Sequence, residues 1–360
     1  MILKSLHTEN FRNLAPEPVS FHPTTNIIVG RNGQGKTNLL EAIYFLATTK
    51  SFRTSRVASL FRFDSPTLFV SGRVERDGVE RNLSAGLETG ETKRRVLMIN
   101  SEKVTLPVYL EALIVFAYSA ARLEIIRGEP EERRRFLDRG IASISGGHVQ
   151  ALTRFTRVLK QRNALLAAVA AREASLASLD AWDEEFLAAG TAIQAARAAY
   201  AEELSVAVAE IVREHRYHVG DLEMRYRPAT GDLAAARRDE LRARTSLSGP
   251  QRDQLEFLIG GRPAAEVLSG GELKTMVLFL KFAKLVLFRR RFDEPPLFLL
   301  DDIDAELDLE ILQSLLARLP ASTQVFATSA KEPFLQALEA GPHVRLTVDA
   351  GRVTAARSFA

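Results

Sequence analysis

The order of apolar and polar residues predicts an α/β fold at both ends of the chain. Residues 27–29, 113–117 and 297–300 are short apolar runs, which are typical of strands buried on both faces of a parallel sheet. Between residues 39 and 46, after the first run and a glycine-rich loop, apolar residues recur at three- and four-residue intervals and predict a helix. Strands that alternate with helices in this way indicate a domain built on a parallel sheet.

A second pattern lies between these α/β segments. From Thr67 to about Val104 apolar residues alternate with polar ones, which is the period of a strand with one buried face. Asp77-Gly78 supplies a hairpin turn, and a second turn is expected near Gly90. We therefore expect an antiparallel β layer beside the parallel sheet.

The middle of the chain predicts long helices. Residues 148–216 are rich in alanine, contain no proline and carry apolar residues at helical spacing. One helix is expected to give way to the next at Gly190 or near Ser178-Leu179-Asp180. Two antiparallel helices of this length would form an arm of roughly 50 Å, which is short for a tethering coiled coil. We expect a head made of residues 1–120 and 245–360, with a mainly helical arm at 121–244.

Composition narrows the class of protein. The 360 residues are 46% apolar and 26% charged, as in ordinary globular domains. The absence of cysteine excludes disulfides and thiolate metal sites. No run of 18 apolar residues predicts a membrane span, and residues 1–7 lack the apolar core of a signal peptide, so we expect a cytoplasmic protein. The net charge of +3 permits a polyanionic partner without requiring one.

The glycine-rich loop predicts a nucleotide site. It fits the phosphate-loop pattern G-x-x-x-x-G-K-[ST], in which backbone N–H groups surround phosphates at the N-terminus of a helix. Lys36 is placed to reach the β- and γ-phosphates, and the Thr37 hydroxyl is placed to hold Mg²⁺. The residues expected to bind the nucleotide are Gly30, Arg31, Asn32, Gly33, Gln34, Gly35, Lys36, Thr37 and Asn38.

Two further segments are expected to complete this site. The apolar run 297–300 ends in Asp301 and Asp302, and ligands bind at the carboxyl ends of strands in an open parallel sheet. Asp301 is suited to Mg²⁺, and Asp302 is placed to polarise an attacking water. Ser269-Gly270-Gly271 begins a predicted helix and forms a second anion-binding segment.

Basic residues gather in the segment that follows the first helix. Lys50, Arg53 and Arg56 lie between Thr48 and Phe63 with phenylalanines among them and no acidic residue. This composition suits contact with the phosphates of DNA, but a solvated basic loop with inward-packed rings explains it too. The same two interpretations apply to the basic residues between 148 and 172, and Arg12 is equally open between a site cation and a surface arginine.

The segment Leu268-Ser269-Gly270-Gly271-Glu272 resembles the signature motif of the ABC-type ATPases. Ala305-Glu306-Leu307-Asp308 resembles their D-loop, at the expected offset from Asp301-Asp302. This resemblance implies an α/β ABC-type P-loop ATPase head, in which two heads sandwich two nucleotides. Each signature motif then meets the γ-phosphate that the partner's phosphate loop holds, so an ATP-dependent homodimer is implied.

Within the ABC-type ATPases the chain resembles the RecF family, which is related to the heads of SMC proteins. The resemblance includes the helical arm, which corresponds to lobe II, and extends from residue 2 to about residue 330. The blocks that carry it are Asn10-Phe11-Arg12-Asn13-Leu14, residues 30–38, Lys50-Ser51-Phe52-Arg53, Arg134-Arg135-Phe136-Leu137-Asp138, Gly249-Pro250-Gln251-Arg252-Asp253 and Leu300-Asp301-Asp302.

Resemblance to the RecF family implies an ATP- and Mg²⁺-dependent DNA-binding protein of recombinational repair and replication-gap repair, linked to the SOS response. The implied dimer clamps DNA, and slow, DNA-stimulated ATP hydrolysis releases it. The implied partners are DNA at single-strand gaps and in duplexes, without sequence specificity, and RecR, RecO and RecA, which the protein helps to load. No membrane partner is implied.

Three departures from the family pattern limit what the resemblance carries over. Asp302 occupies the position of the catalytic carboxylate, which is usually glutamate in ABC-type ATPases. The switch histidine expected after residues 324–327 is absent, and Thr328 and Ser329 occupy that region. Gln251 replaces a histidine of the family block. Apart from these departures, the sequence does not identify a Q-loop glutamine, for which residues 116–121 are the expected region.

Three other functions remain as alternatives. The ATPase subunit of a membrane transporter would usually carry its signature motif about a hundred residues after the phosphate loop, whereas here the separation exceeds two hundred. A chromosome organiser would need a longer arm, and a P-loop kinase would not explain Leu268–Glu272. DNA binding in the absence of membranes distinguishes the RecF-like function from the transporter.

Overall fold

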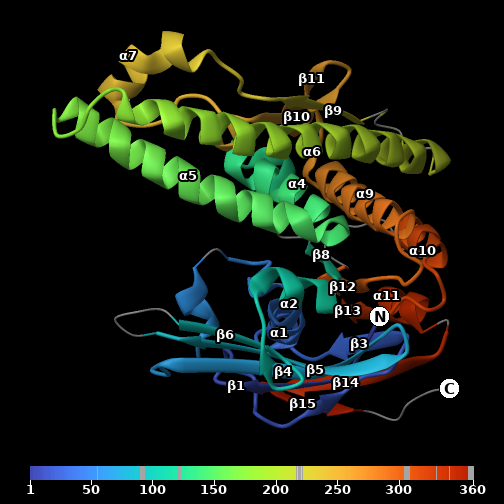
Figure 1. Cartoon of the computed structure of the whole chain (residues 1–360). Helices are drawn as coiled ribbons and strands as arrows, with labels where there is room; N and C mark the ends of the chain where they lie inside the picture. Colours follow the sequence, from blue (N-terminus) through green and yellow to red (C-terminus); the bar gives the residue numbers. More distant parts are fainter. Residues whose placement is uncertain are drawn as a thin grey trace. The chain divides into compact units, whose positions relative to one another are not determined.

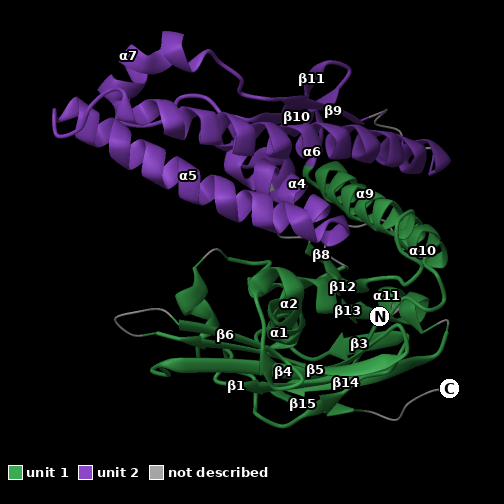
Figure 2. Cartoon of the chain, in the orientation of Figure 1, with its two compact units in different colours: residues 1–122, 270–360 green, residues 123–269 purple. Residues whose placement is uncertain are grey.

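A computed structural model describes residues 1–54, 56–89, 94–119, 123–215, 217, 220, 222–303, 309–329, 331–339 and 341–355. The chain forms two compact units, which Figure 2 colours separately. Unit 1 combines the two ends of the chain, Met1–Arg122 and Gly270–Ala360, and unit 2 is the inserted middle, Leu123–Ser269. The α/β class predicted for the ends is confirmed by the sheets of unit 1 (Figure 1).

The parallel sheet of unit 1 positions the predicted site. Its strand order is β15-β14-β3-β13-β12-β8, and all neighbours run parallel except β14 and β15. The three apolar runs predicted as buried strands became β3, β8 and β12, and every residue of β8 and β12 is buried. The strands are β3 (Thr25–Val29), β8 (Val115–Ser119), β12 (Leu297–Asp301), β13 (Val325–Thr328), β14 (His343–Asp349) and β15 (Arg352–Ala355).

The alternating segment forms the expected antiparallel sheet, of order β2-β1-β4-β5-β6-β7. Asp77 and Gly78 make the predicted turn between β4 and β5, and both have positive φ. The second turn, near Gly90, lies outside the described residues. The strands are β1 (Ile2–Glu9), β2 (Val19–Ser20), β4 (Thr67–Arg76), β5 (Val79–Glu88), β6 (Arg94–Ile99) and β7 (Glu102–Lys103).

Helix α1 (Lys36–Thr48) packs against strands of both sheets, and ten of its 13 residues are buried. Gln324 also joins the sheets, because its side-chain amide accepts from Leu3 N (2.7 Å) and donates to Leu3 O (2.9 Å). The other helices of unit 1 are η1 (Val57–Leu60), α2 (Leu106–Ala112), α9 (Gly270–Arg289), α10 (Leu309–Ala317) and α11 (Glu332–Leu338).

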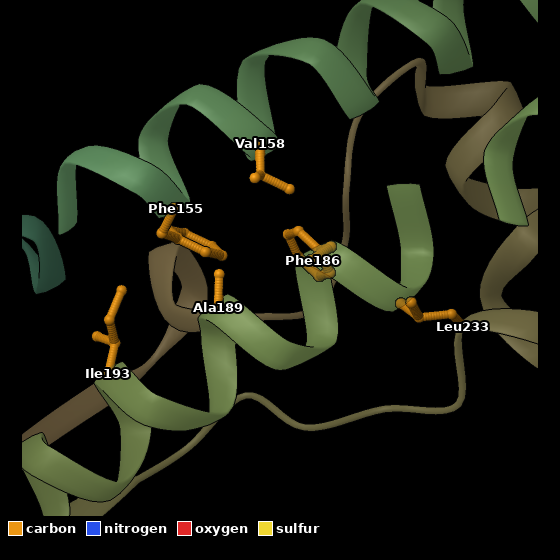
Figure 3. Packing of buried hydrophobic residues seen from close by; sticks show 6 residues of the cluster. All are labelled: Phe155, Val158, Phe186, Ala189, Ile193 and Leu233. Atoms are coloured by element: carbon orange, nitrogen blue, oxygen red, sulfur yellow. The ribbon is translucent and has the colours of Figure 1, made fainter. Parts of the chain in front are cut away.

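Unit 2 is built on a helical hairpin of α5 (Gly146–Ala170) and α6 (Ser178–Glu214). Of the two predicted breaks, the one at Ser178 is where α6 starts, and the one at Gly190 is wrong because this glycine lies inside α6. Aromatic and aliphatic side chains of both helices pack together (Figure 3). The cluster consists of Phe155, Val158, Phe186, Ala189, Ile193 and Leu233.

The remaining elements of unit 2 explain where it ends. Strand β10 (Gln254–Ile259) pairs with β9 (Leu222–Arg227) along its whole length, so residues 245–269 belong to unit 2 and not to the head as expected. The apolar residues of β10 resemble those of the head strands, and only the pairing distinguishes them. The other elements are α3 (Glu124–Arg127), α4 (Pro130–Ile144), α7 (Leu233–Ala243), η2 (Pro250–Arg252), β11 (Arg262–Pro263) and α8 (Ala264–Val267).

Candidate functional site

The loop between β3 and α1 has the backbone that its glycines predict. Gly30, Gly33 and Gly35 have φ of 149°, 81° and 119°, in the region that disfavours other residues. A Cβ on Gly30 would overlap the carbonyl oxygen of Val348, so the loop also needs this glycine for lack of space. Arg31, Asn32 and Gly33 are exposed at the tip of the loop.

The side chain of Lys36 lies inside this loop. Its Nζ donates to the carbonyl oxygens of Gly30 (2.7 Å) and Arg31 (3.2 Å), and the residue is only 7% exposed. A buried ammonium needs acceptors, and the loop carbonyls supply them. The positive charge is therefore held where the loop encloses it.

Three hydroxyl groups surround the carboxylate of Asp301, which is the last residue of β12 and 3% exposed. Thr37 Oγ1 and Thr328 Oγ1 donate to Asp301 Oδ1 at 2.9 and 3.1 Å. Ser119 Oγ, at the end of β8, donates to Oδ2 at 3.4 Å. These residues meet because the carboxyl ends of the parallel strands share one edge of the sheet, and α1 begins there.

Burial first, and the negative charge of Asp302 second, raise the pKa of Asp301 to about 6. An ionised carboxylate that is costly to bury, beside a threonine hydroxyl, fits a hard divalent cation such as Mg²⁺. The described residues contain no group of three or more acidic or histidine side chains that could hold a metal. Such a cation would therefore take most of its ligands from water and phosphate, as Mg²⁺ usually does.

We expect Asp301→Asn to raise the free energy of unfolding at pH 7.5 by up to about 3 kcal/mol, without nucleotide or Mg²⁺. The pKa of Asp301 is about 6 in the folded chain and 3.8 ordinarily, so between these values the folded chain binds more protons than the unfolded chain. The stability that this carboxyl contributes is complete below about pH 4 and is lost as the pH rises through 6, whereas the amide does not titrate. Urea unfolding at pH 5 and 7.5 measures the gain, which should be smaller at pH 5; an equal gain at both would contradict the assignment.

Asp302 follows immediately and is exposed, with φ of 50°. Its backbone N–H donates to Thr328 Oγ1 at 2.8 Å, and the N–H of Ile303 donates to the carbonyl oxygen of Thr328 at 3.3 Å. A left-handed backbone is unusual for an aspartate and has to be stabilised by its surroundings. Adjacent acids thus have different environments, Asp301 buried among hydroxyls and Asp302 open to solvent.

Comparison with known proteins identifies the family of the chain. The sequence model of the RecF/RecN/SMC N-terminal domain matches residues 2–352. A protein of Geotalea daltonii named DNA replication and repair protein RecF is 34% identical over 346 residues, which cover 91% of this chain and 93% of that protein. The protein of the same name from Geobacter metallireducens is 33% identical and covers 98% of this chain and 100% of its own.

The chain belongs to the RecF family. A solved structure of the recombination mediator protein RecF with ATP in the RecFOR pathway has a TM-score of 0.89 at 27% identity, covering 99% of this chain and 98% of its own. An SMC head bound to the C-winged helix domain of ScpA shares the fold, with a TM-score of 0.54 at 16% identity. The family and the ABC-type fold predicted from the sequence are therefore both confirmed.

The basic segment of this RecF chain divides between two surroundings. Arg53, 41% exposed at its side chain, donates to Asn38 Oδ1 at 2.9 Å and so lies beside the first turn of α1. Lys50 and Arg56 are exposed. Of the phenylalanines, Phe52 is buried and Phe63 is 89% exposed, so neither inward packing nor outward presentation describes all of them. The assignment of Lys50, Arg53 and Arg56 to DNA binding stays a prediction.

Glu41 on α1 is a residue that the sequence did not bring forward. Its carboxylate is completely buried and accepts from Arg12 Nε (2.6 Å), Arg12 Nη2 (3.0 Å) and the hydroxyl of Ser51. Arg53 lies 3.7 Å from the same carboxylate. Arg12 is thus an ion-pair partner of the buried Glu41, and its role as a site cation stays a prediction.

A second missed group holds the outer side of the phosphate loop. Asn13 Nδ2 donates to the carbonyl oxygen of Gln34 at 3.0 Å, and Asn38 Nδ2 donates to Asn13 Oδ1 at 2.7 Å. The turn between β14 and β15 donates to Gln34 as well, from Ala350 N to Oε1 (2.5 Å) and from Gly351 N to the carbonyl oxygen (2.8 Å). The side chain of Gln34, predicted to bind the nucleotide, is directed to this turn.

The signature segment lies where the chain passes from unit 2 to unit 1. Leu268 is buried, Ser269 is exposed, and α9 starts at Gly270, so Gly270, Gly271 and Glu272 form its first turn as predicted. The D-loop residues 305–308 lie outside the described residues. Residues 116–119 belong to β8, and residues 120–121 of the expected Q-loop region are likewise outside the described part.

Two of the family blocks meet inside unit 2, on the side chain of Arg197. Its guanidinium donates to Asp138 Oδ1 (2.9 Å) and to Asp253 Oδ2 (2.8 Å), and the buried Asp253 also accepts from Tyr226. Removing one partner of such a buried pair leaves an uncompensated charge. These blocks therefore hold unit 2 together. Gln251, which replaces the family's histidine, donates to the carbonyl oxygen of Ser248 at 2.7 Å.

The second basic segment, residues 148–172, offers less charge to a polyanion than its sequence implies. Arg162 is completely buried and pairs with Glu240 and Asp183. Arg154 pairs with Glu185 at 2.6 Å on the surface. For the other basic residues of this segment, polyanion contact and a solvated helix surface both remain open.

Proposed function

We propose that this RecF-family chain is an ATP-dependent DNA-binding protein of recombinational and replication-gap repair, with weak, DNA-stimulated ATPase activity. The observation that carries the proposal is the convergence of Lys36, Thr37, Asp301 and Asp302 at one edge of the parallel sheet. A related RecF structure is described with ATP, which supports ATP as the ligand. Lys36 and Thr37 begin α1, Asp301 ends β12 and Asp302 follows it, so all four lie at the carboxyl edge of the sheet, where ligands bind.

In this proposal the loop residues 30–38 bind ATP, and Thr37 and Asp301 hold Mg²⁺. The cation, when bound, neutralises charge that develops on the phosphates. With ATP bound, Lys36 would donate to phosphate oxygens in place of the loop carbonyls, and the Thr37 hydroxyl oxygen would be a ligand of the cation. Asp302, exposed to solvent, accepts a proton from the attacking water. Because aspartate is one methylene shorter than the usual glutamate, slow turnover is expected.

The signature segment requires a second copy of the chain. Ser269, Gly270, Gly271 and Glu272 would contact the nucleotide held by the partner, where the N-terminus of the 20-residue helix α9 favours an anion. ATP thus drives formation of a homodimer that clamps DNA, and hydrolysis opens it. The slow step sets how long the protein stays on DNA, which suits a loading factor.

The partners of the chain are proposed from its membership of the RecF family. The related structures are described as recombination mediators in the RecFOR pathway, so we include RecR and RecO as partners and RecA as the protein loaded at single-strand gaps. The exposed Lys50 and Arg56 are proposed to contact DNA phosphates, which carry no sequence information. Cytoplasmic location and a role in the SOS response remain predictions.

The turn that touches Gln34 gives a prediction about nucleotide affinity. A Cβ on Gly351, whose φ is 82°, would overlap the carbonyl oxygen of Asn13, so Gly351→Ala should displace the turn from the phosphate loop. We expect ATP affinity to fall about tenfold and unfolding free energy to fall by about 2 kcal/mol more than in a matched control. Gly78→Ala is that control, because Gly78 has φ of 71° and open space around it. Equal effects of the two substitutions would show that the contact is unimportant.

The alternative is the ATPase subunit of a membrane transporter. No helix in the described ranges is both long and apolar enough to cross a membrane, but such subunits need none of their own. The two functions differ in their ligand, because only the repair function requires DNA. Curated relatives named for DNA replication and repair favour that function.

Fluorescence anisotropy of a labelled gapped duplex and a plain duplex tests the proposal. We expect tight binding only with ATP and Mg²⁺, and weaker binding when the salt concentration is raised, because phosphate contacts release counterions. A preference for the gapped duplex would place gap recognition in this chain, and equal affinities would assign it to partner proteins. Absence of binding under all conditions would overturn the proposal and favour the transporter.

A further inference from the structure

Thr328 makes more contacts with the two acids than any residue discussed so far. It is the last residue of β13 and is completely buried. Its hydroxyl donates to Asp301 Oδ1 at 3.1 Å and accepts from Asp302 N at 2.8 Å, and its carbonyl oxygen accepts from Ile303 N at 3.3 Å. A single side chain therefore joins the carboxylate of one acid to the backbone of the next.

These contacts fix the backbone at Asp302. A non-glycine residue at φ of 50° costs roughly 1–2 kcal/mol and persists only where its surroundings hold it. Among the described residues, Thr328 accepts from the N–H groups of both Asp302 and Ile303, so it holds the left-handed turn after β12 at two successive positions. The direction in which the Asp302 carboxylate points therefore depends on Thr328.

The hydroxyl can also transmit a change. It has one hydrogen, which goes to Asp301, and that bond sets the direction of the lone pair that meets Asp302 N. Thr37 donates to the same oxygen of Asp301, so a change in the Thr37 contact alters the hydrogen bond that Thr328 makes with that oxygen. Ser119, in contrast, contacts the other carboxylate oxygen at 3.4 Å and makes no contact with Asp302 among the described hydrogen bonds.

We propose that Thr328 is a positioning residue for ATP hydrolysis, which orients the Asp302 carboxylate through its backbone and couples that orientation to Asp301. This inference rests on the proposed ATPase function. The proposal assigns a function to Thr328, which occupies the region where the switch histidine of ABC-type ATPases is absent. A hydroxyl that holds the acid in place substitutes here for an imidazole, and it acts through Asp302 without touching the reacting atoms.

Thr328→Val and Thr328→Ser test this proposal. Valine keeps the shape and the backbone carbonyl but removes the hydroxyl, whereas serine keeps the hydroxyl. We expect Thr328→Val to lower kcat for ATP hydrolysis 10- to 100-fold, with the affinity for a slowly hydrolysed ATP analogue within threefold of wild type. The ATP-dependent dimer should persist longer by a similar factor, and Thr328→Ser should restore both rates to within threefold. Loss of analogue affinity in parallel with kcat, or failure of serine to restore the rates, would overturn the proposal.

A double-substitution cycle with Asp302→Asn separates positioning from general stability. If Thr328 acts through Asp302, Thr328→Val should lower kcat by less than threefold when Asp302 is already asparagine. The same 10- to 100-fold loss in that background would show that Thr328 acts independently, against the proposal.

Failure of the proposed ATPase function would give different results from failure of the proposed role of Thr328. If wild-type protein hydrolyses no ATP, or if its hydrolysis survives Lys36→Met, the assignment of the site is wrong. If wild-type hydrolysis depends on Lys36 and Thr328→Val retains full kcat, the site is right and only the role of Thr328 is wrong.

Discussion

Lys36→Met is expected to lower the affinity for ATP by about 100-fold or more and to abolish ATP-dependent dimerisation. The ammonium is enclosed by the loop and bonded to the carbonyl oxygens of Gly30 and Arg31, so methionine removes the charge at the centre of the loop. Loss of charged hydrogen bonds of this kind costs about 3 kcal/mol, which corresponds to a factor of about 100. Titration calorimetry with ATP and Mg²⁺ measures the affinity.

A matched control removes the same charge elsewhere in unit 1. Lys103 on β7 is exposed, and Lys103→Met should leave ATP affinity within about twofold of wild type. Thermal unfolding of both variants without nucleotide checks that each is folded. Unchanged ATP affinity and dimerisation in a folded Lys36→Met variant would show that the loop does not bind the nucleotide.

Ser269→Arg is expected to abolish the ATP-dependent dimer while leaving ATP binding by the monomer within threefold of wild type. Ser269 is exposed directly before α9, at the position where the resemblance to ABC-type ATPases predicts contact with the partner's nucleotide. A bulky side chain there keeps the backbone from approaching that nucleotide. Sedimentation velocity with and without ATP and Mg²⁺ measures the dimer, and anisotropy with duplex DNA should show weaker binding in parallel.

The control for added bulk and charge is Leu187→Arg. Leu187 is 50% exposed on α6, in the same unit as Ser269 and away from the signature segment in sequence. This variant should dimerise with ATP as wild type does. Normal dimers of Ser269→Arg would mean that the two nucleotides are not sandwiched between heads, even if each head binds ATP.

These two substitutions separate what one chain does from what two chains do together. Lys36→Met should remove nucleotide binding from the single chain, and the dimer is lost as a consequence. Ser269→Arg should remove only the dimer. Mixing the two variants gives a further expectation. If each signature motif meets the partner's nucleotide, neither variant should form a homodimer, and the mixture should form no heterodimer that holds two nucleotides.

The elements that could be predicted from the sequence are those with short-range patterns. The glycines of residues 30–35 need their positive φ wherever they lie, and Lys36 and Thr37 follow them at fixed spacing, so the loop and α1 were recognisable. The apolar runs became β3, β8 and β12 because strands buried on both faces require such residues. The position of Asp301 and Asp302 at a strand end followed from the same run.

Predictions failed where the apolar pattern of a segment and its place in the chain do not reveal which strand it pairs with or how it packs. Strand β10 reads like a head strand, yet its partner is β9, and residues 245–269 therefore belong to unit 2. Gly190 was a candidate helix break, but α6 continues through it, since tertiary packing outweighs the propensity of one glycine.

By itself the sequence determined the α/β class, the phosphate-loop pattern and the two acids at a strand end, because each depends on residue types at short, fixed spacing. Resemblance of blocks spread along the chain identified the RecF family. The tertiary structure decided which single residues join them. Thr328, Ser119 and Thr37 meet at Asp301, and Gly351 meets Asn13, across separations of tens to hundreds of residues. One serine, threonine or glycine carries no periodic pattern, so only the parallel strands that bring their carboxyl ends to one edge reveal its role.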